Sequence, residues 1–453
     1  LAAKEEHWAK QLLEHAYLHP DIEDRANLAD YPDSARRKSL LFSSDLGQYS
    51  RLESLRGILM QRVSDKKADQ VTVRRLNMSA ILKLLRERGT LARADLAKEL
   101  GMTRNTASNI VTALLQAGLV VETEFRRAGA GRPGLLLEIA PNGGFAIGAE
   151  IDISRVIVIA VDFRGKTLWE ASAEISAKQP RATIIGTAEQ LVADGLAWGA
   201  AEGLKPLGIG LGLAGLVDSE NGILTYAPTL DWTDVPFQKT WEEKFAVPVH
   251  IDNEANTAAL GYHTYADRST ARNLAYLSIG VGMAAGLMLD GHLFHGSGGF
   301  AGQAGHMKIR IDGEKCACGD HGCWVTEVGV PALARKTKKS PVDLAAITKG
   351  LRENDAELQT VADEMAEMLG LGIANLVNLF NLDTVILGGA MRSVLPFMLE
   401  KTRAVVDQRA LKQPRANVRV KVSGRDDDSV FGAACLVLDS IMNDPVPLVR
   451  SQI

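Results

Sequence analysis

The sequence predicts an α/β protein with a small helical head followed by a larger part built on mixed sheets. Its 453 residues suffice for about three domains of roughly 150 residues each. Residues 71–140 show three helical segments and a hairpin pattern, and strand and helix patterns alternate from Gly144 onward. Hydrophobic residues make up 46% and charged residues 23% of the chain, which excludes a mainly disordered or fibrous protein.

The first 70 residues are polar and favour helix, but they carry no recognisable chemistry. Apolar residues recur at helical spacing around Leu12 and again around Leu55. We expect residues 1–70 to form a helical extension that packs on the rest of the chain or supports dimerisation. A separate active module is the alternative.

Residues 71–137 are basic although the whole chain is slightly acidic. The chain has 51 Lys and Arg and 55 Asp and Glu, which gives a net charge of -4. Within residues 71–137 there are eleven basic and five acidic side chains, so this segment carries +6 and the remainder -10. A basic segment of this kind is typical of a surface that contacts nucleic acid.

Three helices are expected within the basic segment. Residues 80–88 have amphipathic spacing, and residues 92–100 form a second helical pattern that ends at Gly101. Thr103 is a good N-cap for a third helix that runs to about Ala117. A tight glycine turn between the last two helices predicts a helix-turn-helix, whose final helix enters the major groove of DNA by its N-terminal residues.

The third helix and the hairpin after it carry the side chains expected to contact DNA. Arginine pairs bidentately with guanine and asparagine with adenine, and arginines on a Gly-rich wing reach phosphates or a narrow minor groove. The predicted contacts are Thr103, Arg104, Asn105, Thr106, Ser108 and Asn109 on the helix, and Arg126, Arg127 and Arg132 on the wing. We therefore assign residues 71–140 to a winged helix-turn-helix domain. The alternative is a solvated basic loop on a small helical domain.

The remainder of the chain alternates between strand and helix patterns, which predicts an α/β fold with mixed sheets. The expected strands cover residues 145–153, 156–161, 207–213, 247–251, 274–279, 286–289 and 384–387. The expected helices cover residues 184–202 and 360–380, and a further helix starts within residues 252–260.

Three of the four cysteines fall within eight residues and follow a histidine. His306, Cys316, Cys318 and Cys323 offer one nitrogen and three sulfur donors, which complete the tetrahedral shell of a structural Zn²⁺ and leave no open position. His321 in the same loop is an alternative fourth ligand. Three reduced thiols without a metal are the other alternative.

Cysteine usage and hydropathy also indicate a compartment. The cysteines are clustered, whereas a secreted disulfide framework would spread them along the chain. No run approaches the roughly 18 uninterrupted apolar residues of a membrane helix, and the first residues lack the order of a signal peptide. We expect a cytoplasmic protein with no membrane partner.

The segment around the histidine and the cysteines resembles the ROK family of repressors and sugar kinases. The resemblance rests on Phe-Ala-Gly-Gln-Ala-Gly-His-Met at residues 300–307 and on Cys-x-Cys-Gly-x-x-Gly-Cys at residues 316–323. Further matches are the Gly-rich run 211–216, the segment 252–256, the Gly-Val-Gly turn 280–282 and the Ile-Leu-Gly-Gly run 386–389. With the predicted winged head, the resemblance covers about residues 72–440.

The resemblance implies a two-lobed fold of the actin-like sugar-kinase type, with a sugar in the cleft and the zinc loop shaping one wall. We assign residues 141–265 to the first lobe and 266–453 to the second, with a C-terminal helix that is able to return to the first. The implied ligand contacts are Asn253, Glu254, Gln303 and His306. Satisfied polar residues in buried loops are the alternative for these four.

The residues that catalyse phosphoryl transfer in kinases of this family differ here. The resemblance places Asp at the position of Glu254, and Glu at the positions of Gln303 and Val325. The extra methylene of Glu254 moves its carboxylate by about a bond length, and catalysis is sensitive to shifts of that size. In the phosphate loop at residues 150–154 (Glu-Ile-Asp-Ile-Ser), an aspartate and an isoleucine replace glycines, so the loop would repel and obstruct a polyphosphate. We expect no enzyme and no catalytic residue.

The leading hypothesis is a repressor of carbohydrate metabolism or transport genes. It would bind operator DNA as a homodimer or homotetramer and respond to a sugar, a polyol or a sugar derivative, provided the ligand distinguishes two states of the lobes. One alternative is an ATP-dependent sugar kinase with an appended DNA-binding domain. Another is a zinc-dependent oligomeric scaffold that binds neither DNA nor sugar.

Overall fold

The computed structural model describes residues 70–126, 134–266 and 271–450. The extension expected for residues 1–70 therefore lies outside the described residues, apart from Gln70. From Arg74 onward the chain belongs to one compact unit. None of the described helices is long and apolar enough to cross a membrane.

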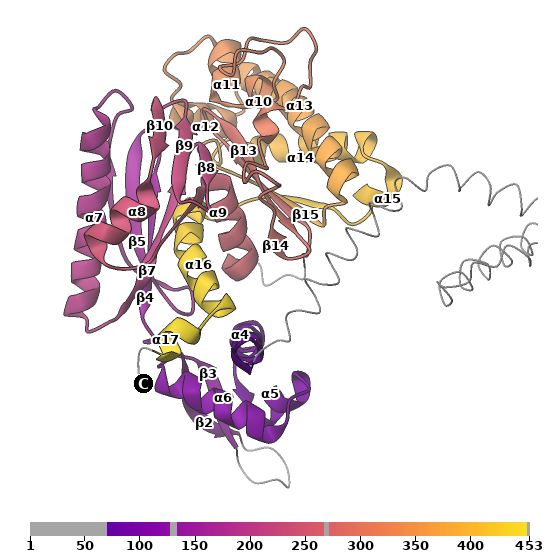
Figure 1. The fold of residues 1–453 in the computed structure, drawn as a ribbon. Coiled ribbons are helices and arrows are strands. Elements are labelled where there is room, and N and C mark those ends of the chain that lie inside the picture. Colours follow the sequence, from indigo (N-terminus) through magenta and orange to yellow (C-terminus); the bar gives the residue numbers. More distant parts are fainter. Residues whose placement is uncertain (1–69, 127–133, 267–270, 451–453) are drawn as a thin grey trace, which may run out of the picture. The chain divides into compact units, whose positions relative to one another are not determined.

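The head consists of three helices and a small sheet in the strand order β1-β3-β2 (Figure 1). Gly101 lies between the second and third helices with φ 61°, a conformation that glycine adopts without steric cost. The elements are α4 (Gln70–Arg88), β1 (Leu91–Ala92), α5 (Arg93–Glu99), α6 (Arg104–Gln116), β2 (Val120–Arg126) and β3 (Gly134–Ile139). The predicted winged helix-turn-helix is confirmed.

Helix α4 is longer than its sequence pattern indicates. It covers Gln70–Arg88, whereas the amphipathic spacing covers only residues 80–88. Its first turns leave Val71, Val73 and Leu76 between 44% and 54% exposed. These apolar side chains do not mark a buried face, so amphipathic spacing does not reveal this part of the helix.

A five-stranded sheet follows in the order β11-β7-β4-β5-β6, with antiparallel pairing from β4 to β6 and parallel pairing from β4 through β7 to β11. Helix α7 (Arg181–Ala201) packs against β4, β5 and β6. The strands are β4 (Phe145–Ile151), β5 (Arg155–Asp162), β6 (Thr167–Glu174), β7 (Pro206–Leu213) and β11 (Val249–Asn253). The sequence patterns miss β6, which is an edge strand and buries few of its side chains.

A small antiparallel sheet and one helix connect β7 to β11. They are β8 (Leu216–Asp218), β9 (Ile223–Ala227), β10 (Trp232–Val235) and α8 (Phe237–Phe245). The sequence analysis expected no strands here, because each of the three has only three to five residues.

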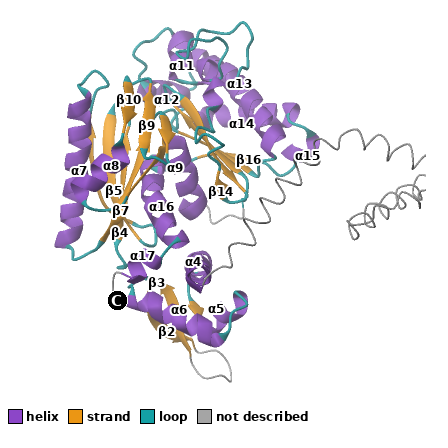
Figure 2. Ribbon diagram, viewed as in Figure 1, coloured by secondary structure: helices purple, strands orange, loops and turns teal. Residues whose placement is uncertain are grey.

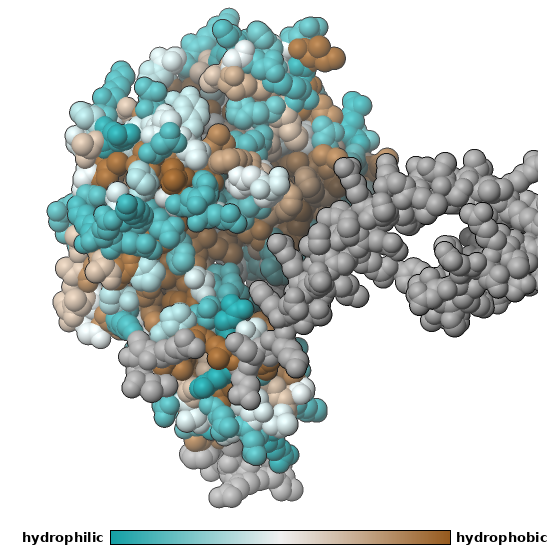
Figure 3. All heavy atoms as spheres, in the orientation of Figure 1, coloured by the Kyte–Doolittle hydropathy of each residue, from teal (hydrophilic) through white to brown (hydrophobic). Residues whose placement is uncertain are grey.

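Hydrophilic side chains cover most of the face visible in Figure 3, and hydrophobic ones gather in its middle, between the two large sheets.

A second five-stranded sheet has the order β14-β13-β12-β15-β16 and is covered by long helices (Figure 2). Its strands are β12 (Leu274–Ile279), β13 (Met283–Leu289), β14 (His292–Leu293), β15 (Thr384–Gly388) and β16 (Arg419–Val422). The helices and turns around it are α9 (Glu254–Gly261), η3 (Tyr262–Ala266), η4 (Ala304–His306), α10 (Val325–Val328), α11 (Val330–Thr337), α12 (Leu344–Arg352), α13 (Ala356–Phe380), α14 (Leu395–Arg409) and α15 (Lys412–Arg415). The mixed sheets confirm the predicted α/β class.

The chain closes with α16 (Asp428–Asn443) and α17 (Val446–Arg450), and α16 lies directly on the first sheet. Gly148 of β4 and Gly210 of β7 are register partners, and together they form a flat surface under the helix. A Cβ atom on Gly148 would lie 2.2 Å from the Val430 carbonyl oxygen, and one on Gly210 would lie 1.7 Å from that of Ala433. On its other side, α16 meets α9 at Gly432, where a Cβ atom would lie 1.7 Å from the Thr257 oxygen.

The contact between α16 and the sheet can be tested by Gly210→Ala. We expect a loss of about 1–3 kcal/mol or more in the free energy of unfolding, because the added methyl group forces the helix away from the strands. Gly186→Ala on α7 is the control, since no atom lies within 4 Å of its added Cβ. The control should be more stable than the parent by about 0.5–1 kcal/mol. Equal stability of the two variants in chemical denaturation would contradict this packing.

Candidate DNA, metal and ligand sites

The residues predicted to contact DNA lie together on the first turns of α6. Thr103 caps the helix, and its Oγ1 accepts a hydrogen bond from the Thr106 backbone N–H at 3.1 Å. The opposite face of the helix is anchored by buried apolar side chains, so its polar face is held outward. Arg104, Asn105 and Asn109 are exposed, and Thr106 and Ser108 are partly exposed.

Arg93 at the start of α5 fixes the position of α6 and was not predicted. Its Nη1 donates to Ser108 Oγ at 3.2 Å, and its Nη2 donates to Glu122 Oε1 on β2 at 2.8 Å. One guanidinium group therefore holds the helix and the hairpin together, and Ser108 is already engaged by it. The partners lie 15 and 29 residues away in the chain, so no local pattern could reveal them.

The predicted wing is described only in part. Strands β2 and β3 form its hairpin, and Arg126 is the last residue of β2. Arg127 and Arg132 lie outside the described residues. Their contacts with DNA remain a prediction.

The predicted metal ligands form a compact cluster of donor atoms. One donor atom from each of His306, Cys316, Cys318 and Cys323 lies within 4.8 Å of all the others. His306 Nδ1 is 3.7 Å from Cys316 Sγ, and Cys318 Sγ is 3.6 Å from Cys323 Sγ. Bonds of about 2.3 Å around a tetrahedral Zn²⁺ separate its ligands by about 3.8 Å, so the four residues fit such an ion.

The surroundings act differently on the thiols of the cluster, since burial raises the pKa of Cys316 to about 11 whereas polar neighbours lie beside Cys318 and Cys323. The Lys308 ammonium donates to Cys323 Sγ at 3.0 Å and pairs with Asp320 at 2.7 Å, and these bonds, led by that to Asp320, raise the pKa of Lys308. A hydrogen bond from the Asp320 backbone lowers the pKa of the Cys318 thiol. A cation at bonding distance from sulfur stabilises the deprotonated form that binds metal. His321, the alternative ligand, is outside the group of four and pairs with Lys315 in an isolated β-bridge.

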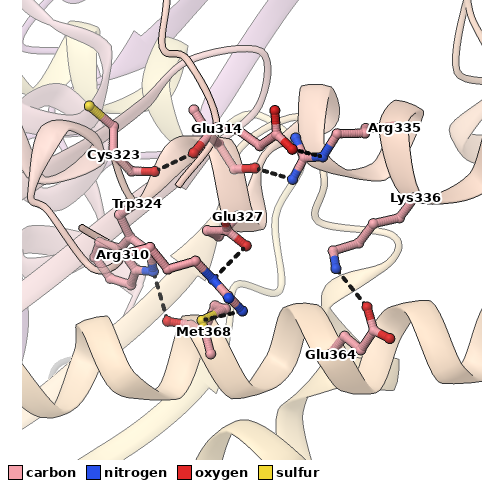
Figure 4. Close-up of polar contacts among 10 residues, drawn as sticks. Arg310, Glu314, Cys323, Trp324, Glu327, Arg335, Lys336, Glu364 and Met368 are labelled. Atoms are coloured by element: carbon pink, nitrogen blue, oxygen red, sulfur yellow. Dashed lines mark hydrogen bonds and ion pairs between the residues drawn. The ribbon is translucent and has the colours of Figure 1, made fainter. Parts of the chain in front are cut away.

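The cluster is anchored to the core of the second sheet's layer by the residue after Cys323. Figure 4 shows Trp324 reaching α13, where its Nε1 donates to the Met368 carbonyl oxygen at 2.9 Å. Trp324 is fully buried, and Gly372 of α13 has no room for a side chain beside its ring. Nearby, Arg310 Nε lies 3.5 Å from Oε2 of the buried Glu327, and the two side chains form an ion pair (Figure 4). The metal loop is therefore continuous with the packed core.

Asn253 and Glu254 lie where β11 ends and α9 begins. Asn253 Oδ1 caps the helix by accepting from the Ala255 N–H at 2.9 Å, and its Nδ2 donates to the Gly215 carbonyl oxygen at 2.8 Å. Glu254 accepts from Ser278 Oγ at 3.1 Å, which links the first turn of α9 to β12. Asn253 therefore caps α9 and ties it to the Gly215 backbone.

Three carboxylates converge beside this junction. Burial raises the pKa of Glu150 to about 8, with further contributions from Glu254 and Asp152. Burial also raises the pKa of Glu254 to about 7, and Asp152 adds to the shift. The side chain of Ser429, at the start of α16, forms a hydrogen bond with Glu150 that partly offsets its shift. Glu150 belongs to the predicted phosphate loop, but this burial was not expected, because a strand pattern does not show which carboxylates meet.

Gln303 and His306 lie on a different element from Asn253 and Glu254. They flank and end the short helix η4, which packs on β13, where the Ala285 N–H donates to the Gly302 carbonyl oxygen at 2.7 Å. Gln303 is partly exposed and His306 is exposed. Within the described ranges, no hydrogen bond or ion pair joins the two pairs of predicted ligand contacts directly.

Two polar pairs that join distant elements were not predicted. Asp252 Oδ2 lies 2.7 Å from His295 Nε2, while its Oδ1 accepts from the Asn253 N–H and from Asn256 Nδ2. The Tyr276 hydroxyl donates to Asp428 Oδ2 at 2.6 Å. The second pair joins β12 to the first residue of α16 across 152 positions of sequence.

Comparisons with known proteins agree with this architecture. A model described as "ROK family" matches residues 146–440, and one described as "Winged helix-turn-helix DNA-binding" matches residues 75–121. A putative xylose repressor of Caldicellulosiruptor sp. (strain Rt8B.4) is 30% identical over 391 residues, which are 82% of this chain and 98% of that protein.

Two solved structures share the fold. A ROK family transcriptional regulator described as a homolog of the E. coli MLC protein superposes with a TM-score of 0.71 at 22% identity, over 84% of this chain and 98% of that one. A ROK family glucokinase from Streptomyces griseus, in complex with glucose and AMPPNP, gives a TM-score of 0.56 at 25% identity, over 65% and 99%. Regulators and kinases thus share this fold, and the fold alone does not separate them.

The ligand set of the metal cluster can be tested by Cys318→Ser and His321→Ala. We expect Cys318→Ser to lose bound metal, because a serine hydroxyl replaces one of the four soft donors. His321→Ala should keep one metal ion per chain. Metal content after dialysis, measured by plasma mass spectrometry, separates the two. If His321→Ala lost its metal, His321 and not His306 would be the fourth ligand.

The buried carboxylates predict a pH-dependent stability. Because the pKa of Glu150 is raised to about 8, the folded protein keeps a proton that the unfolded chain releases near pH 4.5. Stability should therefore fall as pH rises between these values. We expect Glu150→Gln to gain about 1 kcal/mol or more over the parent between about pH 5 and pH 8, measured by denaturant unfolding. Glu353→Gln at an exposed site is the control. If the difference in unfolding free energy between Glu150→Gln and the parent did not change with pH, the raised pKa of Glu150 would be contradicted.

Proposed function

Because the chain belongs to the ROK family, we propose that it is a transcriptional repressor that binds operator DNA through its winged head and responds to a sugar-like ligand held between two lobes. The observation that carries this proposal is the joining of a capped, outward-facing polar helix α6 to the ROK fold in one compact unit. A relative matched over 82% of the chain is named a putative xylose repressor, which supports the same function.

In this proposal α6 reads the major groove and the hairpin contacts the backbone. Arg104 and Asn105 are exposed at the N-terminus of the helix, where a recognition helix contacts base edges. Arg126, Arg127 and Arg132 would contact phosphates or the minor groove. A homodimer or homotetramer would place two heads on two half-sites, as operator symmetry requires.

The ligand would bind between residues 141–265 and residues 266–453. Asn253 and Glu254 on one side and Gln303 and His306 on the other offer amide, carboxylate and imidazole groups that hydrogen-bond to hydroxyls. We therefore propose a sugar, a polyol or a sugar derivative as the effector. Xylose is the first compound to test, because it appears in the name of the relative described above.

The same residues argue against kinase activity. The family's catalytic Asp is replaced by Glu254, and Val325, at the position of a kinase Glu, is buried and cannot bind a hydroxyl. In the phosphate loop, Asp152 lies close enough to Glu150 and Glu254 to raise the pKa of both, so these carboxylates would repel a polyphosphate. The shared fold of the glucokinase keeps the kinase as the second candidate function.

We propose that the cluster of His306, Cys316, Cys318 and Cys323 holds a structural Zn²⁺. All four positions are filled by protein donors, so the ion would cross-link the loop and would not activate water. Thiols that bind metal must stay reduced, which agrees with a cytoplasmic protein.

Helix α16 offers a path from the ligand to the head. Its first residues contact β12 through the Asp428–Tyr276 hydrogen bond, and further along Asp439 lies 3.7 Å from Arg86 of α4. A change in the angle between the two sheets would therefore reach the head through one rigid element. Such coupling requires that the ligand bind the two arrangements with different affinity.

Operator binding by Arg104→Ala and Arg132→Ala tests the proposal. We expect Arg104→Ala to lose about 1–3 kcal/mol of discrimination between operator and mutated operator, because it removes a base contact. Arg132→Ala should weaken binding to all sequences and lower the salt dependence. Fluorescence anisotropy over a salt series, with and without xylose, measures both. Salt-insensitive or absent DNA binding, or phosphorylation of xylose by ATP and Mg²⁺ at ordinary kinase rates, would overturn the assignment.

A further inference from the structure

A cavity of about 400 Å³ lies beside the head, and none of the four proposed ligand residues lines it. Its volume is that of a small-molecule site. Its walls come from α4 of the head, from β11, α9 and η3, from the β13–β14 turn and from α16. The residues that carry its chemistry are Lys83, Arg86, His250, Asp252, His263, His292, His295 and Asp439.

Both acids of the cavity already have cationic or polar partners. Asp252 Oδ2 is paired with His295 Nε2 at 2.7 Å. Asp439 accepts from Asn443 Nδ2 at 2.8 Å and lies 3.7 Å from Arg86 Nη1. The remaining basic groups are therefore not neutralised by the acids that line the cavity.

Two cations of the head line the cavity, Lys83 and Arg86, and Arg86 forms a long ion pair with Asp439. Arg86 Nη1 is buried and has no hydrogen-bond partner, since 3.7 Å to Asp439 is within ion-pair range but too long for a hydrogen bond. Lys83, one helical turn before it, is exposed and forms no ion pair with any described residue. A buried guanidinium nitrogen without a partner is destabilising unless a ligand or water accepts its hydrogen bond.

The histidines of the cavity suit hydroxyl groups. Burial lowers the pKa of His250 and of His263, which favours the neutral rings. A neutral His250 ring has one donor and one acceptor, whereas one nitrogen of His263 already bonds to the Ala271 backbone and only the other is left for a ligand. His292 Nδ1 contacts the Asp290 carbonyl oxygen at 3.0 Å, which leaves its Nε2 for another partner. Thr264 and Ser219 add hydroxyls to the wall.

We propose that this cavity is a second effector site, which binds an anionic sugar with its acid group on Lys83 and Arg86 and its hydroxyls on the histidines. The bound molecule would connect α4 of the head to α16 and to the β13–β14 turn. Binding would therefore fix the head against the rest of the unit. The effect on operator affinity rests on the proposed function, whereas ligand binding itself does not.

Isothermal titration of the full chain, without DNA, tests the site. The probes are glucose 6-phosphate and glucuronate, with glucose and inorganic phosphate as comparisons. The variants are Lys83→Gln with Arg86→Gln in the cavity, Gln303→Ala in the proposed sugar site, and Lys98→Gln as an exposed lysine on α5 outside the cavity. Lys83 is exposed, so Lys83→Gln should leave the fold intact. Its thermal unfolding, compared with that of the parent, shows whether a loss of affinity reflects a loss of stability.

We expect at least one anionic sugar to bind more tightly than glucose and inorganic phosphate. Its affinity should fall at least tenfold in the double variant and several-fold in Lys83→Gln, and it should change less than twofold in Gln303→Ala and Lys98→Gln. Binding of only one of the two sugars identifies the acid group. No binding by either sugar, equal binding of glucose, or a loss confined to Gln303→Ala would overturn the proposal. Because DNA is absent, such a failure leaves the repressor assignment untouched.

Discussion

The close approach of the α16 backbone to the first sheet is the constraint on which the rest of the structure depends. Gly148 and Gly210 are neighbours in register, and either Cβ atom would lie 2.2 Å or less from a carbonyl oxygen of the helix. Only a surface without side chains lets α16 lie so deep. From that position the helix also packs against α9, and its later residues share a hydrophobic core with α4 and α6 of the head.

This position gives the two ends of α16 different tasks. At its start, Asp428 accepts a hydrogen bond from Tyr276, and Ser429 interacts with the partly buried Glu150. Near its end, Asp439 approaches Arg86 of the head. The 16 residues of the helix span about 24 Å, so one rigid element extends from the carboxylates to the head.

The sequence was informative where a structure depends on neighbours in the chain. The turn at Gly101, the Thr103 cap and the Cys-x-Cys cluster are local features, and each could be located before the fold was known. The sequence analysis expected a C-terminal helix able to return to the first lobe, but no local pattern showed where α16 would pack. Most of its residues are buried, and the glycines that receive it lie more than 200 positions earlier.

Long-range polar contacts were missed for a related reason. Arg93 with Glu122, Asp252 with His295 and Tyr276 with Asp428 are pairs whose chemistry is common to many exposed side chains. Only the tertiary fold shows that these particular residues meet. The predicted ligand contacts were found only in part. The resemblance implied which four residues to consider, but only the structure shows that they lie as two pairs on different elements.

The two roles proposed for His306, metal ligand and sugar contact, are compatible in geometry. A metal ligand and a sugar contact cannot use the same ring nitrogen. Nδ1 is the atom that lies 3.7 Å from Cys316 Sγ, so a metal bound there leaves Nε2 to the ligand. If a metal were held by Nδ1, the ring proton would lie on Nε2, which could then donate to a ligand hydroxyl. The metal would thus set both the direction and the hydrogen-bonding character of one wall of the ligand site, without contacting the ligand itself.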